Sequence, residues 1–469
     1  MSFRISNWEG STTSSPRVVA EAQSVEDIIA VVRNPERYPA PVRAIGSNHS
    51  TTRCGVADGG TMILMHGMNR VLEVGEDFVT AEAGALYIDV AKTLERHGRQ
   101  FHVNVELGNL TVGSAACGGT KDASMPGEFG QVSSYVIGVK MVTPAGEMLE
   151  ITQEDPERLR MVRASYGLFG IIYEVTFKIA PLRAMAVHHQ SFGLDEFERR
   201  LPELIGRGES MMLYIMPFLG SVTVEFRRYH DAPTPAASHW QWRLRNWAWS
   251  KATPLFAYLL TKYVPAKRIR YFVIDGLNRI VTLVLRWLVR GRNTVPTDQI
   301  IRYPSQAGKS KYTFSIWAFP EHEYPRILHE YSGFCRAYYA RTGYRPNLTH
   351  VGYRIAHDEG SHFSYSSEGT VLTIDPVSTA DPGWEVFLHA YNEFCSEHGG
   401  VPLFNQTRGI TRDQARRAFG NRLTAFEAER ARFDPDNRLL NEYFADILST
   451  EQAHAQRRER APGDAAVPG

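Results

Sequence analysis

Residues 41–50 bring an apolar run, a glycine, a histidine and a serine into close succession, and they constrain the fold more than any other stretch of the chain. Gly46 ends the apolar run, and glycine lets a backbone turn tightly and approach a ligand closely. Successive backbone N–H groups in such a turn form a concave site that suits pyrophosphate. His49 lies in the same turn, where its ring can bond to whatever the turn holds. An isolated stretch of this kind is most often an ordinary turn.

Three further blocks follow in the sequence. Residues 108–120 form a second glycine-rich segment, and residues 139–147 combine a strand pattern with a proline-containing turn. Residues 165–172 then lead into an alternating strand pattern over 173–179. The order and spacing of the four blocks, rather than any single one, carry the functional signal.

These four blocks resemble the FAD-binding domain of the vanillyl-alcohol oxidase (PCMH-type) flavoprotein superfamily. The nearest branch comprises the gulonolactone, arabinonolactone and alditol oxidases, which carry an Arg-x-x-Gly-x-x-His-Ser element. Arg43, Gly46, His49 and Ser50 match that element. The resemblance covers residues 15–183 and returns at residues 434–444, which are similar to the C-terminal signature of the family.

The resemblance implies FAD as the cofactor, with its pyrophosphate held by the two glycine-rich loops. It implies that His49 bonds covalently to the flavin; the alternative is a histidine that only packs beside the ring. Asn109 stands where relatives with a second covalent bond have cysteine, so we expect a single attachment. The implied cofactor-binding residues are Arg43, Gly46, Ser47, Asn48, His49, Ser50, Gly113, Ser114, Cys117, Gly118, Gly119, Gly170, Ile171, Ile172 and Asn441.

The implied fold class is α+β, in which a two-part FAD-binding domain over residues 10–183 is followed by a cap domain over 184–430 built from antiparallel strands and helices. We expect residues 431–449 to return to the FAD-binding domain and residues 450–469 to form a disordered tail. A length of 469 residues suits two domains around a buried cofactor. The periodicity predicts helices over 24–33, 87–98, 191–207, 321–340 and 384–398, and strands over 41–46, 62–65, 78–83, 211–216, 221–226, 312–317, 351–355 and 369–374.

Three departures from the lactone and alditol oxidases concern the substrate. Lys121 replaces a histidine of those relatives, Gly352 replaces an acidic residue, and residues 402–408 lack the lysine of a Pro-His-Trp-x-Lys block. These changes indicate a substrate other than a free sugar lactone. The candidate catalytic residues are Lys121, Tyr353, Arg354, Asn405 and Arg408, with His350 and Gln406 as further candidates, although each residue type in such a position is more often structural. A lysine base needs its pKa lowered by burial or by a positive neighbour, whereas arginines suit the clamping of an anion.

Residues 239–292 interleave five tryptophans and several arginines with apolar runs. Charges interrupt each run before the roughly 20 residues needed to span a bilayer. One interpretation is a buried pair of cap helices. The other is a basic amphipathic hairpin that lies on a membrane or guides an apolar substrate.

The composition narrows the class of protein. A net charge of +1 excludes nucleic acid as the main partner. The four cysteines, Cys54, Cys117, Cys335 and Cys395, are scattered and have no metal-ligand spacing, so we expect no metal site and a cytoplasmic location, either free or at the inner face of the membrane. The N-terminus has no apolar signal core. The sequence thus predicts an enzyme that takes an alcohol and an electron acceptor; the alternative is a flavin-binding protein at a membrane that has lost alcohol oxidation.

Overall fold

A small parallel sheet begins the fold of the computed structural model, which describes residues 3–235, 240–290, 293–303, 308–309 and 311–449. Its order is β3-β5-β4, with bounds Val18–Glu21, Thr61–Leu64 and Val42–Ile45. Helix α1 (Val25–Arg33) connects β3 to β4, and Ser24 and Asp27 form the capping box that the sequence predicts. Because β4 ends at Ile45, the turn at Gly46 starts at the edge of this sheet.

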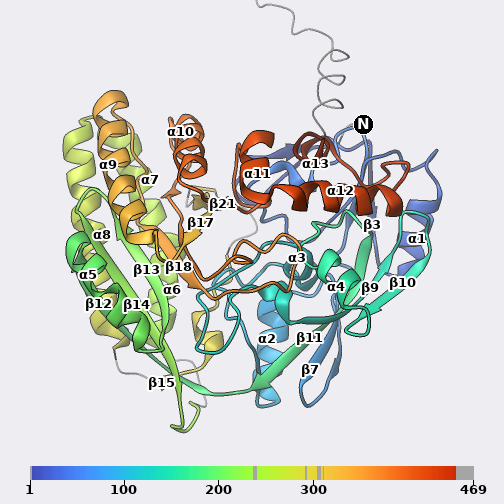
Figure 1. The fold of residues 1–469 in the computed structure, drawn as a ribbon, viewed down its shortest axis with the longest axis horizontal. Coiled ribbons are helices and arrows are strands. Elements are labelled where there is room, and N and C mark those ends of the chain that lie inside the picture. The colour runs from blue at the N-terminus through green and yellow to red at the C-terminus, as the bar shows by residue number, and fades with distance from the viewer. Residues whose placement is uncertain (1–2, 236–239, 291–292, 304–307, 310, 450–469) are drawn as a thin grey trace, which may run out of the picture.

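A second, antiparallel sheet of six strands follows (Figure 1). Its order is β10-β9-β11-β7-β6, with β8 paired to β11. The bounds are β6 Val71–Val74, β7 Phe78–Glu82, β8 Arg99–Phe101, β9 Val136–Val142, β10 Met148–Thr152 and β11 Ile171–Pro181. The packed helices are α2 (Tyr87–Arg96), α3 (Val112–Cys117) and α4 (Pro156–Val162). These elements share one apolar core with the parallel sheet.

The third sheet has eight strands and lies opposite the first two in Figure 1. Its order is β15-β12-β14-β13-β18-β19-β17-β21. The bounds are β12 Ala184–Gly193, β13 Ser210–Met216, β14 Ser221–His230, β15 Asn293–Thr294, β17 Trp317–Pro320, β18 His350–Ile355, β19 Val371–Ile374 and β21 Val401–Pro402. Helices α5 (Leu194–Gly206), α9 (Tyr324–Thr342) and α10 (Trp384–Glu397) bury a separate aromatic-rich core against it. The mixed helix-and-sheet architecture agrees with the α+β class.

Two predicted elements need correction. The predicted helix over 191–207 starts only at Leu194, because residues 184–193 pair with β14 along their whole length. The predicted strand over 312–317 is divided between β16 (Thr313–Phe314) and β17, which pair with different partners. In both places a tertiary partner, rather than local periodicity, decides where the element ends.

The C-terminal helices α11 (Arg412–Phe419), α12 (Asn421–Phe433) and α13 (Glu442–Leu448) pack beside the first two sheets. Phe426 and Phe444 lie in the same core as Val42 and Met141. The Arg43 guanidinium donates a hydrogen bond to the Leu439 carbonyl at 3.0 Å, which ties β4 to the segment before α13. Residues 450–469, predicted to be a tail, lie outside the described residues.

Residues 240–290 form helices. Helix α6 (Trp240–Trp247) continues through a π-helical turn, η3 (Ala248–Ala252), into α7 (Thr253–Tyr263), and α8 (Lys267–Val289) follows. Among the helices that the structure describes, none is long and apolar enough to span a lipid bilayer.

Candidate functional site

A cavity of about 1390 Å³, open mouth included, lies between the loops of the first two sheets and the eight-stranded sheet. One wall consists of the turn after β4 and the segment around α3. The other consists of residues from β16 and β18, the residue after β19 and the loop after β21. The cavity therefore brings residues from both halves of the chain around one space.

The turn after β4 supplies Gly46, Ser47, Asn48, His49 and Ser50 to the lining. Asn48 has a left-handed backbone with φ of 53°, the conformation that turns neighbouring N–H groups to one side. A Cβ on Gly46 would lie 2.1 Å from the Thr111 hydroxyl, so only glycine lets this turn touch the second loop. The two glycine-rich segments therefore form one continuous wall.

The second segment begins at Thr111, whose side chain caps α3 by accepting from the Ser114 backbone N–H. Ser114, Cys117, Gly118 and Gly119 line the cavity. Burial raises the pKa of the Cys117 thiol to about 11, so this cysteine is a neutral, packed group. A Cβ on Gly119 would lie 3.1 Å from Asn405 Oδ1, so the two walls of the cavity are in close contact at this glycine.

His49 is 7% exposed and lines the cavity. Burial lowers its pKa to about 4, so the imidazole is neutral at pH 7. Its Nδ1 is buried and has no hydrogen-bond partner among the described residues. The Trp8 ring lies 5.3 Å from the His49 ring, centre to centre, and the Trp8 backbone N–H donates to the Asn48 carbonyl at 3.2 Å. Sequence patterns gave no signal for Trp8, because it lies in the turn between two short strands, β1 (Ile5–Ser6) and β2 (Thr13–Ser14).

The remaining predicted cofactor-binding residues support the first wall of the cavity, but most of them do not line it. Arg43 lines the cavity but donates to the carbonyls of Cys54, Tyr166 and Leu439, so it acts as a brace. Asn441 lies outside the lining, caps α13, and donates to the carbonyls of Arg53, Cys54 and Val56. In the described structure, four further candidates do not line the cavity but pack inside the core: Gly113, Gly170, Ile171 and Ile172.

Lys121, from the segment after α3, reaches the opposite wall, where its Nζ lies 3.1 Å from Asp375 Oδ2 and 3.7 Å from the centre of the Tyr353 ring. Both side chains of the ion pair are almost fully buried. Burial lowers the pKa of Lys121, whereas the charge of Asp375 opposes that shift. Burial likewise raises the pKa of Asp375, against the opposing effects of Lys121 and the Thr373 hydroxyl. Asp375 Oδ1 is buried and has no hydrogen-bond partner in the part of the chain that is described.

The loop after β21 completes the lining with Asn405 and Gln406. The Asn405 carbonyl accepts from the Thr51 backbone N–H at 3.0 Å, and the Thr51 hydroxyl lies 3.1 Å from the Gln406 carbonyl. Asn405 Oδ1 is buried and lacks a hydrogen-bond partner within the described residues. Residues 402–408, which lack the lysine of the lactone and alditol oxidases, thus place two neutral amide side chains at this end of the cavity.

Three predicted candidates lie outside the lining of the cavity in the described structure. Arg354 pairs with Glu321, and Arg408 pairs with Glu385 at 3.0 Å. His350 is buried, and its Nδ1 lies 2.8 Å from the Tyr331 hydroxyl. Gly352 lies in β18, where a Cβ would come within 2.4 Å of the Thr373 carbonyl, so the fold has no room for the acidic side chain of the relatives.

Besides Trp8, the lining includes residues that the sequence did not single out, among them Glu106, Asp375, Tyr303 and Tyr312. Asp375 directly follows a fully buried strand. Tyr303 lies outside every predicted element and Tyr312 begins a predicted strand, so neither position indicated a cavity. Their positions depend on long-range contacts such as the T-shaped packing of Tyr303 on Trp8.

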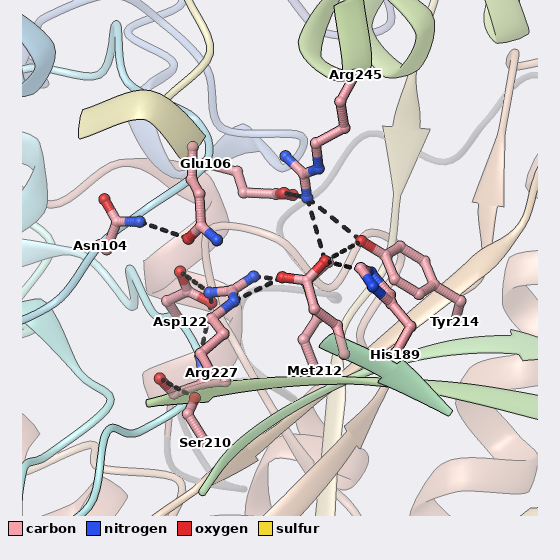
Figure 2. A network of polar contacts seen from close by, with 12 residues as sticks. Asn104, Glu106, Asp122, His189, Ser210, Met212, Tyr214, Arg227 and Arg245 are labelled. Atoms are coloured by element: carbon pink, nitrogen blue, oxygen red, sulfur yellow. Dashed lines mark hydrogen bonds and ion pairs between the residues drawn. The ribbon is translucent and has the colours of Figure 1, made fainter. Parts of the chain in front are cut away.

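A buried network of charges supports the wall from behind (Figure 2). Glu225 accepts from Arg227 Nε at 2.7 Å and from the Tyr214 hydroxyl at 2.9 Å, and His189 Nε2 lies 3.0 Å from it. Arg227 also donates to Asp122, one residue after Lys121. Arg245 donates to Glu106 at 2.6 Å and so joins α6 to a residue of the cavity lining. The network holds the segment around Lys121 against the eight-stranded sheet.

The cavity fits a flavin dinucleotide on these observations. One wall is a left-handed turn in tight contact with a second glycine-rich segment, as pyrophosphate binding requires. His49, Asp375 and Asn405 line the same cavity, and each has a buried side-chain polar atom that lacks a protein partner among the described residues. Native proteins rarely leave such atoms unsatisfied, so a bound group is expected to satisfy them.

Comparison with known proteins agrees with this site. Residues 16–152 match the family described as FAD binding domain. The chain is 23% identical over 448 residues to the L-gulono-1,4-lactone dehydrogenase of Mycobacterium tuberculosis (strain ATCC 25618 / H37Rv), covering 94% of this chain and 98% of that protein. It is 22% identical over 459 residues to the L-gulonolactone oxidase of Bos taurus, covering 95% and 98%.

Among solved structures, the fold superposes on cholesterol oxidase from B. sterolicum with a TM-score of 0.77 at 12% sequence identity, covering 96% of this chain and 97% of that chain. At this identity the likeness concerns the fold. Together, the matched FAD-binding domain and the relatives support a relationship to the PCMH-type FAD oxidases near the gulonolactone and arabinonolactone oxidase branch.

Proposed function

We propose that this protein is an FAD-dependent oxidoreductase that oxidises an alcohol at its CH–OH carbon; the bound FAD would supply the hydride acceptor, its N5. The single observation that carries the proposal is that one cavity joins a flavin-type loop wall to a buried carboxylate with a free oxygen. Relatives over nearly the whole chain are named as a lactone dehydrogenase and a lactone oxidase. The electron acceptor is accordingly oxygen or another oxidant.

In this proposal the turn at Gly46 and the segment from Ser114 to Gly119 hold the cofactor. His49 forms a single covalent bond to the flavin. The low pKa of His49 supports this role, because a neutral imidazole presents an unshared electron pair. The matching position in the resemblance supports it independently.

Asp375 is the proposed acceptor of the hydroxyl proton. Lys121 holds it ionised through Oδ2, which leaves Oδ1 to receive a hydrogen bond from the substrate. Lys121 is thereby a positioning residue, and the Tyr353 ring below its ammonium group restricts where that group can move. Departure of the hydroxyl proton to Asp375 strengthens the tendency of the carbon to release hydride.

The substrate is proposed to be apolar or membrane-borne rather than a free sugar lactone. Tyr303, Tyr312, Phe314, Ile316 and Val351 contribute apolar surface to the lining of the cavity. Arg354 and Arg408 are paired elsewhere, and no acidic side chain fits at position 352. An environment of aromatic rings with few polar groups favours a hydrophobic alcohol. Contact with the cytoplasmic face of a membrane through residues 239–292 belongs to the same proposal; positions 239, 291 and 292 lie outside the described residues.

The alternative is a flavin-binding protein without alcohol oxidase activity. The loss of the polyol-binding residues at positions 352 and 402–408 favours it. The carboxylate of Asp375 argues against it, because a buried, half-satisfied charge costs stability and has no evident structural purpose.

The test is anaerobic bleaching of the purified yellow protein. A panel of sterols, long-chain alcohols, short alcohols and sugar lactones is added in turn, and the absorbance near the flavin band is followed. The proposal expects reduction by an apolar alcohol and little by sugar lactones. Glu323→Gln, which alters only an exposed ion pair on α9, serves as the matched control. Flavin that dithionite reduces but no alcohol reduces would favour the alternative.

A further inference from the structure

Helix α8 exposes an apolar stripe along its whole length. Ile269, Phe272, Ile280, Leu283 and Trp287 are 61%, 79%, 59%, 51% and 78% exposed. Their spacing, completed by the exposed Gly276, advances by three or four residues at each step, so they share one face of the helix. A long ordered helix with this face in water lacks a partner.

The two preceding helices repeat the pattern. Leu255, Leu259 and Tyr263 are exposed at four-residue intervals on α7. Trp240, Leu244 and Trp247 are exposed at intervals of four and three residues on α6, with Trp240 at 56% and Trp247 at 55%. We refer to the exposed apolar residues of α6, α7 and α8 as the apolar face.

The apolar face belongs to helices that are firmly attached to the protein. Trp242 is fully buried against Met185, Val187 and Val289 of the eight-stranded sheet and α8. Arg345 donates to Asp275 of α8 at 2.6 Å. Trp249 stacks on Tyr214 at 5.4 Å. Of the five tryptophans in this segment, Trp242 and Trp249 therefore serve packing, whereas Trp240, Trp247 and Trp287 belong to the apolar face.

The charge of the segment is strongly one-sided. Residues 240–290 contain ten Lys and Arg and one Asp, whereas the rest of the chain contains 42 Lys and Arg and 50 Asp and Glu. Arg243, Lys251, Lys262, Lys267, Arg268 and Arg279 are exposed. A second copy of this face would bring like charges together, which disfavours a symmetric dimer through it. An anionic surface is the complementary partner.

We infer that the apolar face docks on an anionic lipid bilayer, with α8 lying in the plane of the interface. Exposed tryptophan and leucine side chains enter the boundary between headgroups and acyl chains, and the flanking lysines and arginines contact lipid phosphates. Helix α8 is about 34 Å long and contains Arg279 and Arg286, a composition that suits lying on a membrane rather than crossing it.

The docking helices also contact the wall of the cavity. Arg245, the inward-facing arginine of α6, donates to Glu106, which lines the cavity (Figure 2). Docking would thus place the cavity beside the bilayer. This inference rests on the proposed function for the delivery of a membrane-borne alcohol, but docking itself requires no substrate.

The test measures co-sedimentation of the full-length holoprotein with vesicles, without substrate. One set contains phosphatidylserine and phosphatidylcholine, and the other contains phosphatidylcholine alone. The inference expects binding to the anionic vesicles and much weaker binding to the neutral ones. The triple variant Phe272→Ser, Ile280→Ser and Trp287→Ser should weaken binding by about tenfold or more, because each change removes apolar area from the contact. Arg268→Glu with Arg279→Glu should weaken anionic binding selectively.

The control variant Leu72→Ser, Met148→Ser and Val386→Ser removes exposed apolar side chains elsewhere and should leave binding unchanged. Retained flavin absorbance confirms that each variant is folded. Wild-type protein that stays in the supernatant with anionic vesicles overturns the inference, as does equal binding of the triple variant. A wild-type oligomer that the triple variant dissociates, without vesicle binding, would assign the face to a protein partner instead. None of these outcomes depends on alcohol oxidation, so the two proposals fail independently.

Discussion

Lys121 and Asp375 form a buried ion pair, 3.1 Å between Nζ and Oδ2, across 254 residues of sequence. The lysine comes from the segment that follows the second glycine-rich loop, and the aspartate directly follows β19 of the eight-stranded sheet. The pair therefore joins the two walls of the cavity. It also gives Asp375 one satisfied oxygen and one free oxygen within the described structure, which is the arrangement that a proton acceptor needs.

The first prediction concerns this carboxylate. Asp375→Asn should lower kcat for alcohol oxidation by about 100-fold or more, because the amide cannot accept the hydroxyl proton. The spectrum of bound flavin should remain. Stopped-flow reduction of the flavin by substrate measures the effect. Unchanged reduction rates would remove Asp375 from the chemistry.

Replacement of Lys121, the ion-pair partner of Asp375, should shift the pH profile of kcat/KM. Lys121→Met removes the positive charge that opposes the burial of Asp375, so the pKa of the carboxyl rises further. Activity needs the ionised form, and the acid limb of kcat/KM should therefore move to higher pH. Lys121→Arg keeps the charge and should restore the limb toward the wild-type position. A uniform loss at every pH would instead indicate a structural role.

His49→Ala should abolish covalent attachment of the flavin while allowing noncovalent binding. Acid precipitation separates the two states, because covalent flavin stays with the pellet. The flavin-bearing tryptic peptide of the wild type should contain residue 49. Flavin that remains entirely in the supernatant of the acid-treated wild type would show that the bond does not form.

Gly119→Val should weaken FAD binding. The added Cβ lies 3.1 Å from Asn405 Oδ1 and 3.3 Å from two Leu403 side-chain atoms, so these side chains must shift, and Asn405 lines the space assigned to the cofactor. Flavin release on dilution provides the measurement. Gly193→Ala, where a Cβ meets nothing within 4 Å, is the matched control. If the valine variant binds FAD as tightly as the wild type, the loop at Gly119 does not approach the cofactor.

His350, which lies outside the cavity lining, should make the free energy of unfolding depend on pH. Burial lowers its pKa from 6.5 to about 3, so between these values the unfolded chain binds a proton that the folded protein does not. The free energy of unfolding should fall as pH falls from 6.5, by up to about 1.4 kcal/mol per pH unit from this group. His350→Asn should reduce that slope in denaturant titrations at pH 7, 6 and 5. If the free energy of unfolding depends on pH equally in the wild type and the variant, His350 does not contribute to this dependence.

Local chemistry made much of the FAD side predictable. The turn at Asn48, with its left-handed backbone, and the capped α1 are properties of short segments, and short segments fix turns and caps. The domain boundaries and the catalytic role of any single residue remain predictions. Arg354 and Arg408 had suitable chemistry in the sequence, but their ion-pair partners, Glu321 and Glu385, are chosen by the packing of helices and strands.

The sequence by itself determined the cofactor class, because pyrophosphate recognition depends on backbone N–H groups within two contiguous loops and so leaves a local pattern. Tertiary structure alone decided the other wall. Asp375, Glu106, Tyr303 and Tyr312 reach the cavity from separate segments, and sheet pairing and a buried charge network, rather than local pattern, bring them together. The same holds for residues 240–290, where apolar side chains look alike in sequence. Only packing separates the buried Trp242 from the exposed Trp287, because burial depends on which side of a helix meets the sheet.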